Sequence, residues 1–311
     1  KSADANLQFV LLTGVTKFSQ VSVFSGFNQP KDISMDPRYE ALCGITEEEL
    51  YQYFPEPIER LAVQYKCSVP QMKERLKKEY DGYHFSDVLT DIYNPFSILN
   101  VFDSNRINDY WFKTGTPTYL IRLLNHTQEN LNELTGKYYD PSEFIDYKAD
   151  VEMPLPMIYQ SGYLTIKDYN MDMNTYLLDF PNNEVKKGFV TMVANDYLKS
   201  KNLAGGWARD LVDALKSADL ERFRKLLTSF LADIPYTMRR KETERERERY
   251  FHYTFYLLMR MVSCYTVYTE KQQSEGRVDC IVETSDYIYI FEFKLDGTAD
   301  EALAQIEEKG Y

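Results

Sequence analysis

Charged side chains interrupt two apolar runs near the end of the sequence. The run from Tyr287 to Leu295 is apolar or aromatic except at Glu292 and Lys294, and Asp279 interrupts the apolar run 278–282. A sheet interior rarely tolerates such charges unless they pair with each other or bind a metal ion. These three residues are therefore the first candidates for chemistry.

Strand geometry predicts that two of these charges lie together. Residues two apart along a strand share a face and lie roughly 6.6 Å apart along it. Glu292 and Lys294 are therefore expected to share a face with Ile288 and Ile290. The aromatic residues between them are expected to lie on the opposite face.

This set of residues suits phosphodiester hydrolysis. We expect Asp279 and Glu292 to bind Mg²⁺ (or Mn²⁺), which prefers oxygen ligands, and the backbone carbonyl of Phe293 to add a further oxygen. Such an ion polarises a phosphoryl oxygen and activates a bound water. Lys294 would position that water and stabilise the charge of the transition state. The alternative is a structural ion pair at the edge of a sheet.

The elements around these residues follow a definite order. Apolar residues at helical spacing predict a helix over 242–263. Alternation predicts strands over 264–270, from Arg277, and over Tyr287–Leu295. Thr298 to Glu301 has the pattern of a capping box and predicts the start of a second helix. The predicted order is helix, three strands, helix.

The segment GRVDCIVETSDYIYIFEFKL resembles the RvD…EfK signature of the PD-(D/E)xK nuclease superfamily. The resemblance implies a restriction-endonuclease-like αβββα core that hydrolyses DNA or RNA. It adds Gln305, on the last helix, to the catalytic residues, and Glu248, on the first helix, to the metal ligands. Gln305 could instead be a polar position beside Ala302 and Ile306, and Glu248 a solvated member of the charged run 239–249.

The chain as a whole resembles bacterial proteins in which an AAA-ATPase-like domain precedes such a nuclease domain. The segments that carry this resemblance are LLTGVTKFSQVSVFSGFNQPKDISMDP, YDGYHFS, NPFSILN, YWFKTGTPTYL, QSGYLTIKDY and FPNNEVKKGF. The resemblance implies an α/β protein of three parts. These are the C-terminal part of an AAA-ATPase-like α/β domain (1–135), a helical and winged-helix-like connecting region (136–230) and a nuclease-like domain (231–311).

The phosphate loop that such an ATPase needs is absent from these residues. The loop ends in Gly-Lys-Ser/Thr after an earlier glycine, whereas the single Gly-Lys pair here, Gly136-Lys137, is followed by Tyr138. We therefore expect ATP to bind only to a longer form that carries the loop. Two rival interpretations remain: a non-catalytic regulatory protein that retains the nuclease fold, and an ATP-driven switch that only binds nucleic acid.

Composition limits the choice of partners. The chain has 311 residues, is 44% hydrophobic and has a formal charge of −12, so contact with nucleic acid requires a local basic surface. Four scattered cysteines without a CxxC pair disfavour a zinc site or a disulfide framework. No apolar run is long enough to span a bilayer. These features predict a cytoplasmic protein without membrane contact and leave its oligomeric state open. The expectation of a nucleic-acid substrate comes from the candidate site and the resemblance, not from composition.

Local patterns predict several elements of the earlier part of the chain. The apolar run Phe9–Leu12 is expected to form a buried strand, and Thr46 to Glu49 a capping box that opens a helix. Residues 69–80 are expected to form an amphipathic helix, and residues 163–180 a hairpin around a polar loop. Aromatic segments between 81 and 125 are expected to be loops that contribute to the core.

Overall fold

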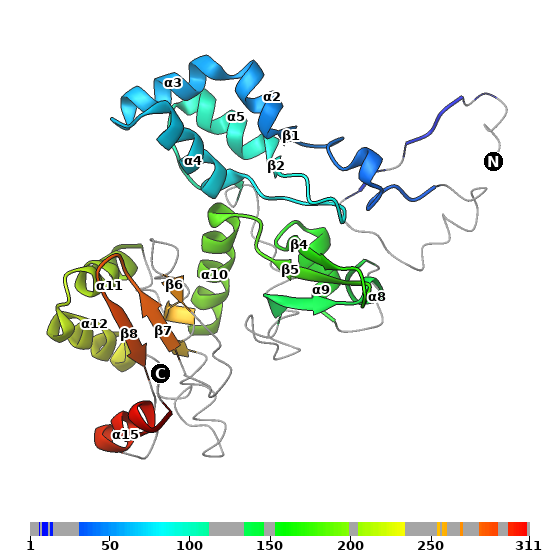
Figure 1. The fold of residues 1–311 in the computed structure, drawn as a ribbon. Helices are drawn as coiled ribbons and strands as arrows, with labels where there is room; N and C mark the ends of the chain where they lie inside the picture. Colours follow the sequence, from blue (N-terminus) through cyan, green and yellow to red (C-terminus); the bar gives the residue numbers. More distant parts are fainter. Residues whose placement is uncertain are drawn as a thin grey trace. The chain divides into compact units, whose positions relative to one another are not determined.

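The structure of the chain is a computed structural model (Figure 1). The residues it describes are 6, 8–11, 13–14, 31–111, 134–145, 153–198, 205–233, 254–255, 257–259, 268–269, 280–291 and 298–309. Their contacts divide the chain into two compact units, Lys1–Gly188 and Phe189–Tyr311. Both units are mixed α/β structures with small sheets. No helix among the described residues combines the length and apolarity needed to cross a membrane.

The first unit begins with a group of short helices around an apolar core. These elements are the 3-10 helix η2 (Pro37–Tyr39), strand β1 (Ile45–Thr46), helices α2 (Glu47–Tyr53), α3 (Pro55–Gln64) and α4 (Val69–Tyr80), strand β2 (Ile92–Tyr93) and helix α5 (Pro95–Ser104). Strands β1 and β2 pair in antiparallel fashion. The helices bury one common set of side chains, which includes Leu50, Ile58, Leu61, Met72, Leu76, Tyr80, Tyr93, Ile98, Val101 and Phe102.

Side chains at the helix starts explain where these helices begin. The Thr46 hydroxyl accepts a hydrogen bond from the amide of Glu49, whose carboxylate accepts one from the amide of Thr46, so the predicted capping box is confirmed. Ser68 and Gln71 form the same arrangement at the start of α4, and α4 confirms the helix predicted over 69–80. Each box satisfies backbone amides that the first turn of a helix leaves without partners.

A three-stranded sheet forms the second part of this unit. Strands β3 (Lys137–Tyr139), β4 (Thr165–Asn170) and β5 (Thr175–Asp179) are antiparallel in the order β3-β5-β4, accompanied by helices α8 (Pro141–Phe144) and α9 (Leu155–Gln160). The pairing of β4 with β5 confirms the predicted hairpin. Strand β3 was not predicted, because three residues that pair with a strand more than thirty positions later leave no local pattern.

The second unit contains several helices and a further small sheet. Helix α10 (Asn183–Leu198) crosses from the first unit into the second and precedes α11 (Gly205–Lys216) and α12 (Leu220–Asp233). Strands β6 (Tyr268–Thr269), β7 (Cys280–Glu283) and β8 (Ile288–Phe291) are antiparallel in the order β6-β7-β8, and helix α15 (Ala299–Lys309) follows them (Figure 1).

This order agrees with the predicted succession of three strands and a helix. The helix predicted over 242–263 is described at 254–255 and 257–259, which are helical. The side chains of Phe255 and Leu258, which the predicted apolar stripe includes, are buried.

Two predictions for the first unit are wrong. Residues Phe9 to Leu11 form no strand, and the side chain of Phe9 is 80% exposed; Leu12 lies outside the described residues. A buried strand needs neighbours that accept its backbone hydrogen bonds, and no described ladder includes this run. The segment NPFSILN is part of helix α5 rather than a loop. Asn94 caps its first turn and Pro95 occupies its first position, and both favour a helix start.

Candidate functional site

The hairpin of β7 and β8 is the described structure that directly adjoins the predicted catalytic residues Asp279 and Glu292 in the sequence. Its antiparallel register pairs Cys280 with Phe291, Ile281 with Ile290, Val282 with Tyr289 and Glu283 with Ile288. The tight turn is held by Thr284, whose amide donates to the carbonyl of Tyr287 at 2.8 Å. The amide of Tyr287 donates back to the Thr284 hydroxyl at 3.0 Å. A turn closed in both directions fixes the register of the strands that leave it.

The aromatic face of β8 packs against helices of the same unit. The ring of Phe291 lies 5.6 Å from Phe223 of α12 and 5.1 Å from Phe255. The Tyr289 hydroxyl donates a hydrogen bond to the carbonyl of Leu215, in α11, at 2.6 Å. Tyr289 and Phe291 therefore share a covered face, as the alternation of the sequence predicts.

The opposite face of β8 is open at its start. Ile288 is 67% exposed, although it stands in the same apolar run as its aromatic neighbours. Residues 290 and 292 follow Ile288 at the two-residue spacing of a strand face. Of these, Ile290 is half-buried. The hairpin thus has one face anchored to helices and a second face that begins at the surface.

The predicted site residues themselves fall mostly beyond the described part of the chain. Asp279, Glu292, Phe293, Lys294 and Glu248 lie outside the described residues.

Gln305 belongs to helix α15, but its side chain lies outside the described part. The start of that helix is confirmed, because Thr298 and Glu301 exchange hydrogen bonds as in the predicted capping box. Among the side chains that the structure describes, no group of three or more His, Cys, Asp or Glu could hold a metal ion.

Comparison with known families assigns the region that contains this hairpin. Residues 246–311 match the family described as the PD-(D/E)XK nuclease superfamily. This part of the chain is therefore a PD-(D/E)XK nuclease superfamily domain. The match includes Asp279, Glu292, Lys294, Gln305 and Glu248, but it does not extend to residues 1–245. The ATPase-like interpretation of the first part of the chain stays a prediction.

One relative is similar over the entire chain. It is described as an uncharacterized protein in the vnfD 5′ region of Azotobacter chroococcum mcd 1, and it is 32% identical over 315 residues. The alignment covers 100% of this chain but 58% of the relative. The chain thus corresponds to little more than half of that protein's length. No solved structure matches the chain.

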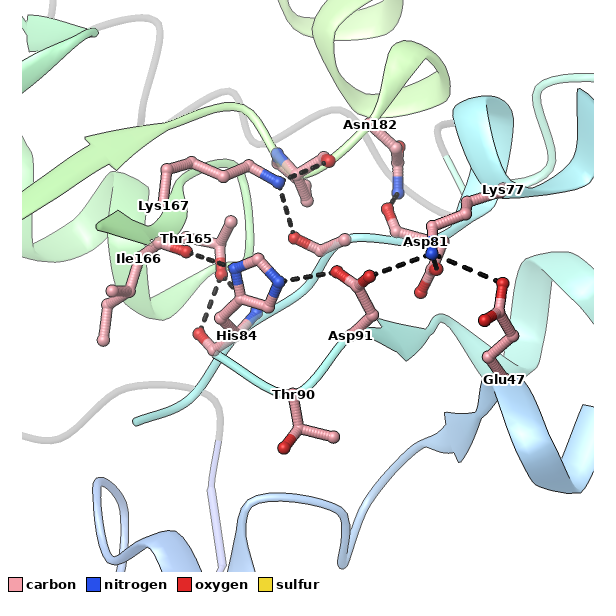
Figure 2. A network of polar contacts seen from close by, with 12 residues as sticks. Glu47, Lys77, Asp81, His84, Thr90, Asp91, Thr165, Ile166, Lys167 and Asn182 are labelled. Carbon is pink, nitrogen blue, oxygen red and sulfur yellow. Dashed lines mark hydrogen bonds and ion pairs between the residues drawn. The ribbon is translucent and has the colours of Figure 1, made fainter. Parts of the chain in front are cut away.

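A second candidate site, which sequence reasoning missed, lies in the first unit (Figure 2). The ammonium of Lys77, on α4, lies 3.1 Å from Asp91, 3.3 Å from Glu47 and 3.9 Å from Asp81. We call these four residues the Lys77 cluster. Partial burial acts to lower the pKa of Lys77, but the hydrogen bonds and charges of Asp91 and Glu47 outweigh it and raise the pKa.

His84 connects the Lys77 cluster to the sheet of the first unit. Its Nε2 lies 2.7 Å from a carboxylate oxygen of Asp91, and its Nδ1 lies 2.6 Å from the carbonyl of Ile166, in β4. Both partners accept hydrogen bonds, so a ring protonated on both nitrogens donates to each of them. The main chain of His84 also exchanges hydrogen bonds with the Thr165 hydroxyl, at 2.8 Å in both directions.

Asp91 takes part in both sets of contacts. Partial burial raises its pKa, but the hydrogen bonds from His84 and Lys77 are stronger in total, and the net pKa is lowered. Asp91 therefore remains a carboxylate that links helix α4 to strand β4.

Lys167 and Asn182 add further hydrogen bonds between the segment that follows α4 and the rest of the first unit. The Lys167 ammonium donates to the carbonyls of Gly82, at 2.8 Å, and Pro181, at 2.9 Å, and burial lowers its pKa. The Asn182 amide donates to the carbonyl of Asp81 at 3.0 Å. A side chain at Gly82 would not fit here, because its Cβ would lie 2.5 Å from the carbonyl oxygen of Pro181. The glycine of YDGYHFS is therefore explained by close packing.

Glu184 forms a second connection within the first unit. Its buried carboxylate accepts hydrogen bonds from the Ser97 hydroxyl, at 2.6 Å, and from the amides of Tyr110 and Trp111, at 2.5 and 2.8 Å. Burial raises its pKa, although these three donors oppose the change. Glu184 thus ties α5, the segment after α5 and the first turn of α10 together.

The contacts around Asp91, His84 and Lys167, together with those of Glu184, explain most of the motifs of the earlier part of the chain. The segments YDGYHFS, NPFSILN, QSGYLTIKDY and FPNNEVKKGF all supply residues to them. The signal available in the sequence was the number of polar residues within aromatic segments. It did not identify partners, because bonded residues such as His84 and Thr165 lie 81 positions apart.

Proposed function

We propose that the chain carries the catalytic domain of a metal-dependent nuclease that hydrolyses phosphodiester bonds of DNA or RNA. The observation that supports this most is the register of β7 and β8, which ends at the pair Cys280 and Phe291. One further pair in the same register would join Asp279 with Glu292. Directly opposed residues of an antiparallel pair have Cβ atoms about 4.5–5.5 Å apart, a spacing at which two carboxylates can share one ion.

The alternation of the strands supports the same assignment. Cys280 and Phe291 are directly paired, so they lie on the same face of the hairpin. Because Phe291 packs against Phe223 of α12, this is the face that the helices cover. The next pair, Asp279 and Glu292, would lie on the opposite face, which begins at the exposed Ile288. Lys294 would follow on that face. This arrangement would leave all three charges open to a substrate.

The donor set fits the expected ion. Two carboxylates and the carbonyl of Phe293 supply only oxygen, which Mg²⁺ and Mn²⁺ accept. When bound, the ion would polarise the phosphoryl group and favour the hydroxide form of a bound water. Asp279 and Glu292 would hold the ion, and the Lys294 ammonium would orient the attacking water and stabilise negative charge on the phosphoryl oxygens.

The test uses labelled single-stranded and double-stranded DNA and RNA with Mg²⁺ or Mn²⁺. Asp279→Asn, Glu292→Gln and Lys294→Met should each lower cleavage at least a hundredfold, and the first two should also weaken metal binding in calorimetry. Glu283→Gln is the matched control. It removes an exposed carboxylate from the same strand, at an even spacing from Asp279, and should leave both measurements unchanged.

Other results would contradict the proposal. Metal binding without cleavage of any of these substrates favours the non-catalytic interpretation. Cleavage that survives Lys294→Met rejects the role given to that residue.

Finer parts of the proposal are supported by resemblance alone. We propose that Gln305 and Glu248 assist the site, that residues 1–135 are the C-terminal part of an ATPase-like domain that gates it, and that the protein acts in the cytoplasm. A longer protein that carries the phosphate loop should bind ATP, whereas the present chain should not. Equal ATP affinity for the two forms would reject the gating proposal.

A further inference from the structure

The Lys77 cluster distributes one ammonium unevenly among three carboxylates. Asp91 and Glu47 lie at 3.1 and 3.3 Å from Lys77, within hydrogen-bond distance, whereas Asp81 lies at 3.9 Å. Asp91 has a second partner, the Nε2 of His84. Glu47 has a second partner in the Tyr51 hydroxyl, at 2.9 Å. Asp81 has the smallest share of the positive charge.

Asp81 is also the most buried member of the cluster. Its side chain is 1% exposed, and no described side chain donates a hydrogen bond to either carboxylate oxygen. A buried carboxylate with so little compensation is costly, and the cost disappears when the group takes up a proton.

The position of Asp81 connects this proton to the fold of the first unit. The residue stands between α4 and the segment 82–94, whose carbonyls and side chains hold β4 through Lys167 and His84. Its own carbonyl accepts the bond from Asn182 at the start of α10. Any opening that brings water to the Asp81 carboxylate must separate some of these contacts.

The contacts of residues 81–94 with β4 and with the start of α10 are called the Asp81 junction below. We propose that this junction is a proton-dependent lock, which closes when Asp81 is neutral and loosens when Asp81 is ionised. The groups whose charges act on the Asp81 carboxyl, or are affected by it, are Lys77 on α4, Glu47 on α2, Asp91 just before β2, Tyr93 in β2 and Lys167 on β4. Next to these, Tyr51 bonds Glu47, His84 bonds Asp91, and Asn182 bonds the Asp81 carbonyl. Asp91 and Glu47 oppose ionisation of Asp81, and Lys77 favours it.

The direction of the effect follows from the pKa of Asp81. Burial, and then the charge of Asp91, raise this pKa from 3.8 to about 6, although the Gly82 amide and Lys77 lower it. The closed form therefore binds the proton more tightly than an open form with an ordinary pKa. Closure is favoured as the pH falls through 6 and weakened as it rises. With these two pKa values, the equilibrium constant for opening increases about tenfold between pH 5 and pH 8.

Hydrogen exchange of the junction amides measures this opening. The amides of Tyr83, His84, Ile92 and Asn94 each donate a hydrogen bond within the junction. In the full chain, the exchange rates of these amides should increase about tenfold from pH 5 to pH 8, after division by the rate of an unprotected amide at the same pH. Asp81→Asn, which mimics the neutral form, should remove the increase and keep exchange slow throughout.

Two further variants keep the test decisive. Asp172→Asn removes an exposed carboxylate from the loop between β4 and β5 and should behave as the wild type. Glu47→Gln removes one of the charges that oppose ionisation, so it should shift the transition to lower pH, even if Asp81→Asn fails to fold. The lock is rejected if exchange in the wild type does not depend on pH, if Asp81→Asn keeps the full dependence, or if Glu47→Gln causes no shift.

Discussion

The hydrogen bond between Ser97 and Glu184 allows a quantitative test of how the first unit is held together. Both side chains are buried, and the hydroxyl donates to a carboxylate at 2.6 Å. A hydrogen bond to a charged group contributes about 1.5–3 kcal/mol to stability. Ser97→Ala should therefore lower the free energy of unfolding by about 2 kcal/mol. Glu184 keeps its bonds to the amides of Tyr110 and Trp111, which limits the loss.

Glu184→Gln should cost a similar amount, because an amide offers one acceptor oxygen where the carboxylate offers two. The double variant should cost less than the sum of the two single variants. The shared bond can be lost only once, so the coupling energy should be about 1–2 kcal/mol. Asp103→Ala, at an exposed position of the same helix, is the matched control and should change the free energy of unfolding by less than about 0.5 kcal/mol.

The assay is urea unfolding followed by fluorescence of Trp111, whose ring contacts Tyr163 at 4.9 Å and so reports on the first unit. The chain has one other tryptophan, Trp207, and all variants should carry Trp207→Phe so that a single unit is observed. Additive single and double variants, within about 0.5 kcal/mol, would mean that the two side chains do not interact, and the connection through Glu184 would have to be abandoned.

Three further results are expected. Gly82→Ala should destabilise the first unit by at least about 2 kcal/mol in the same urea assay, because residue 82 has a φ of +90° and no space for a Cβ. A smaller loss of stability would contradict the packing described around Gly82. Phe291→Ala should cost about 2–4 kcal/mol in thermal unfolding, because the ring packs on helices, and Ile288→Ala less than about 0.5 kcal/mol, because that side chain is exposed. Equal costs would contradict the distinction between the two faces of β8. Asp81→Asn should gain stability over the wild type by about 1.4 kcal/mol more at pH 8 than at pH 5, and a constant difference would show that the pKa of Asp81 is not raised.

Elements specified by neighbouring residues were predictable from the sequence. The capping box from Thr46 to Glu49, the helix over 69–80 and the hairpin of β4 and β5 each depend on residues a few positions apart. In the same way, alternation correctly placed Tyr289 and Phe291 on one face of β8.

Features that depend on distant partners were not predictable. Strand β3 pairs with a strand far along the chain, and the run from Phe9 looked like a buried strand only because it is apolar. The Lys77 cluster brings together residues from α2, α4 and the approach to β2, none of which has a local signal for the others.

The candidate nuclease residues show both situations. The spacing of Glu292 and Lys294 is a local property of one strand, so their common face could be expected from the sequence. The proposed partnership of Asp279 with Glu292 depends on the register between two strands. That register became available only from the pairs between Cys280–Glu283 and Ile288–Phe291.

The sharing of Asp91 between Lys77 and His84 has an evolutionary consequence. Loss of Asp91 removes the acceptor at Nε2 of His84 and leaves Lys77 with Glu47 as its nearest carboxylate, whereas loss of Lys77 or His84 removes one of the two donors that stabilise the Asp91 carboxylate. Single changes should therefore be selected against, whereas joint replacement of all three by an apolar set would be tolerated. Among related sequences, these three positions should vary as a group, although the first and the last lie 14 positions apart.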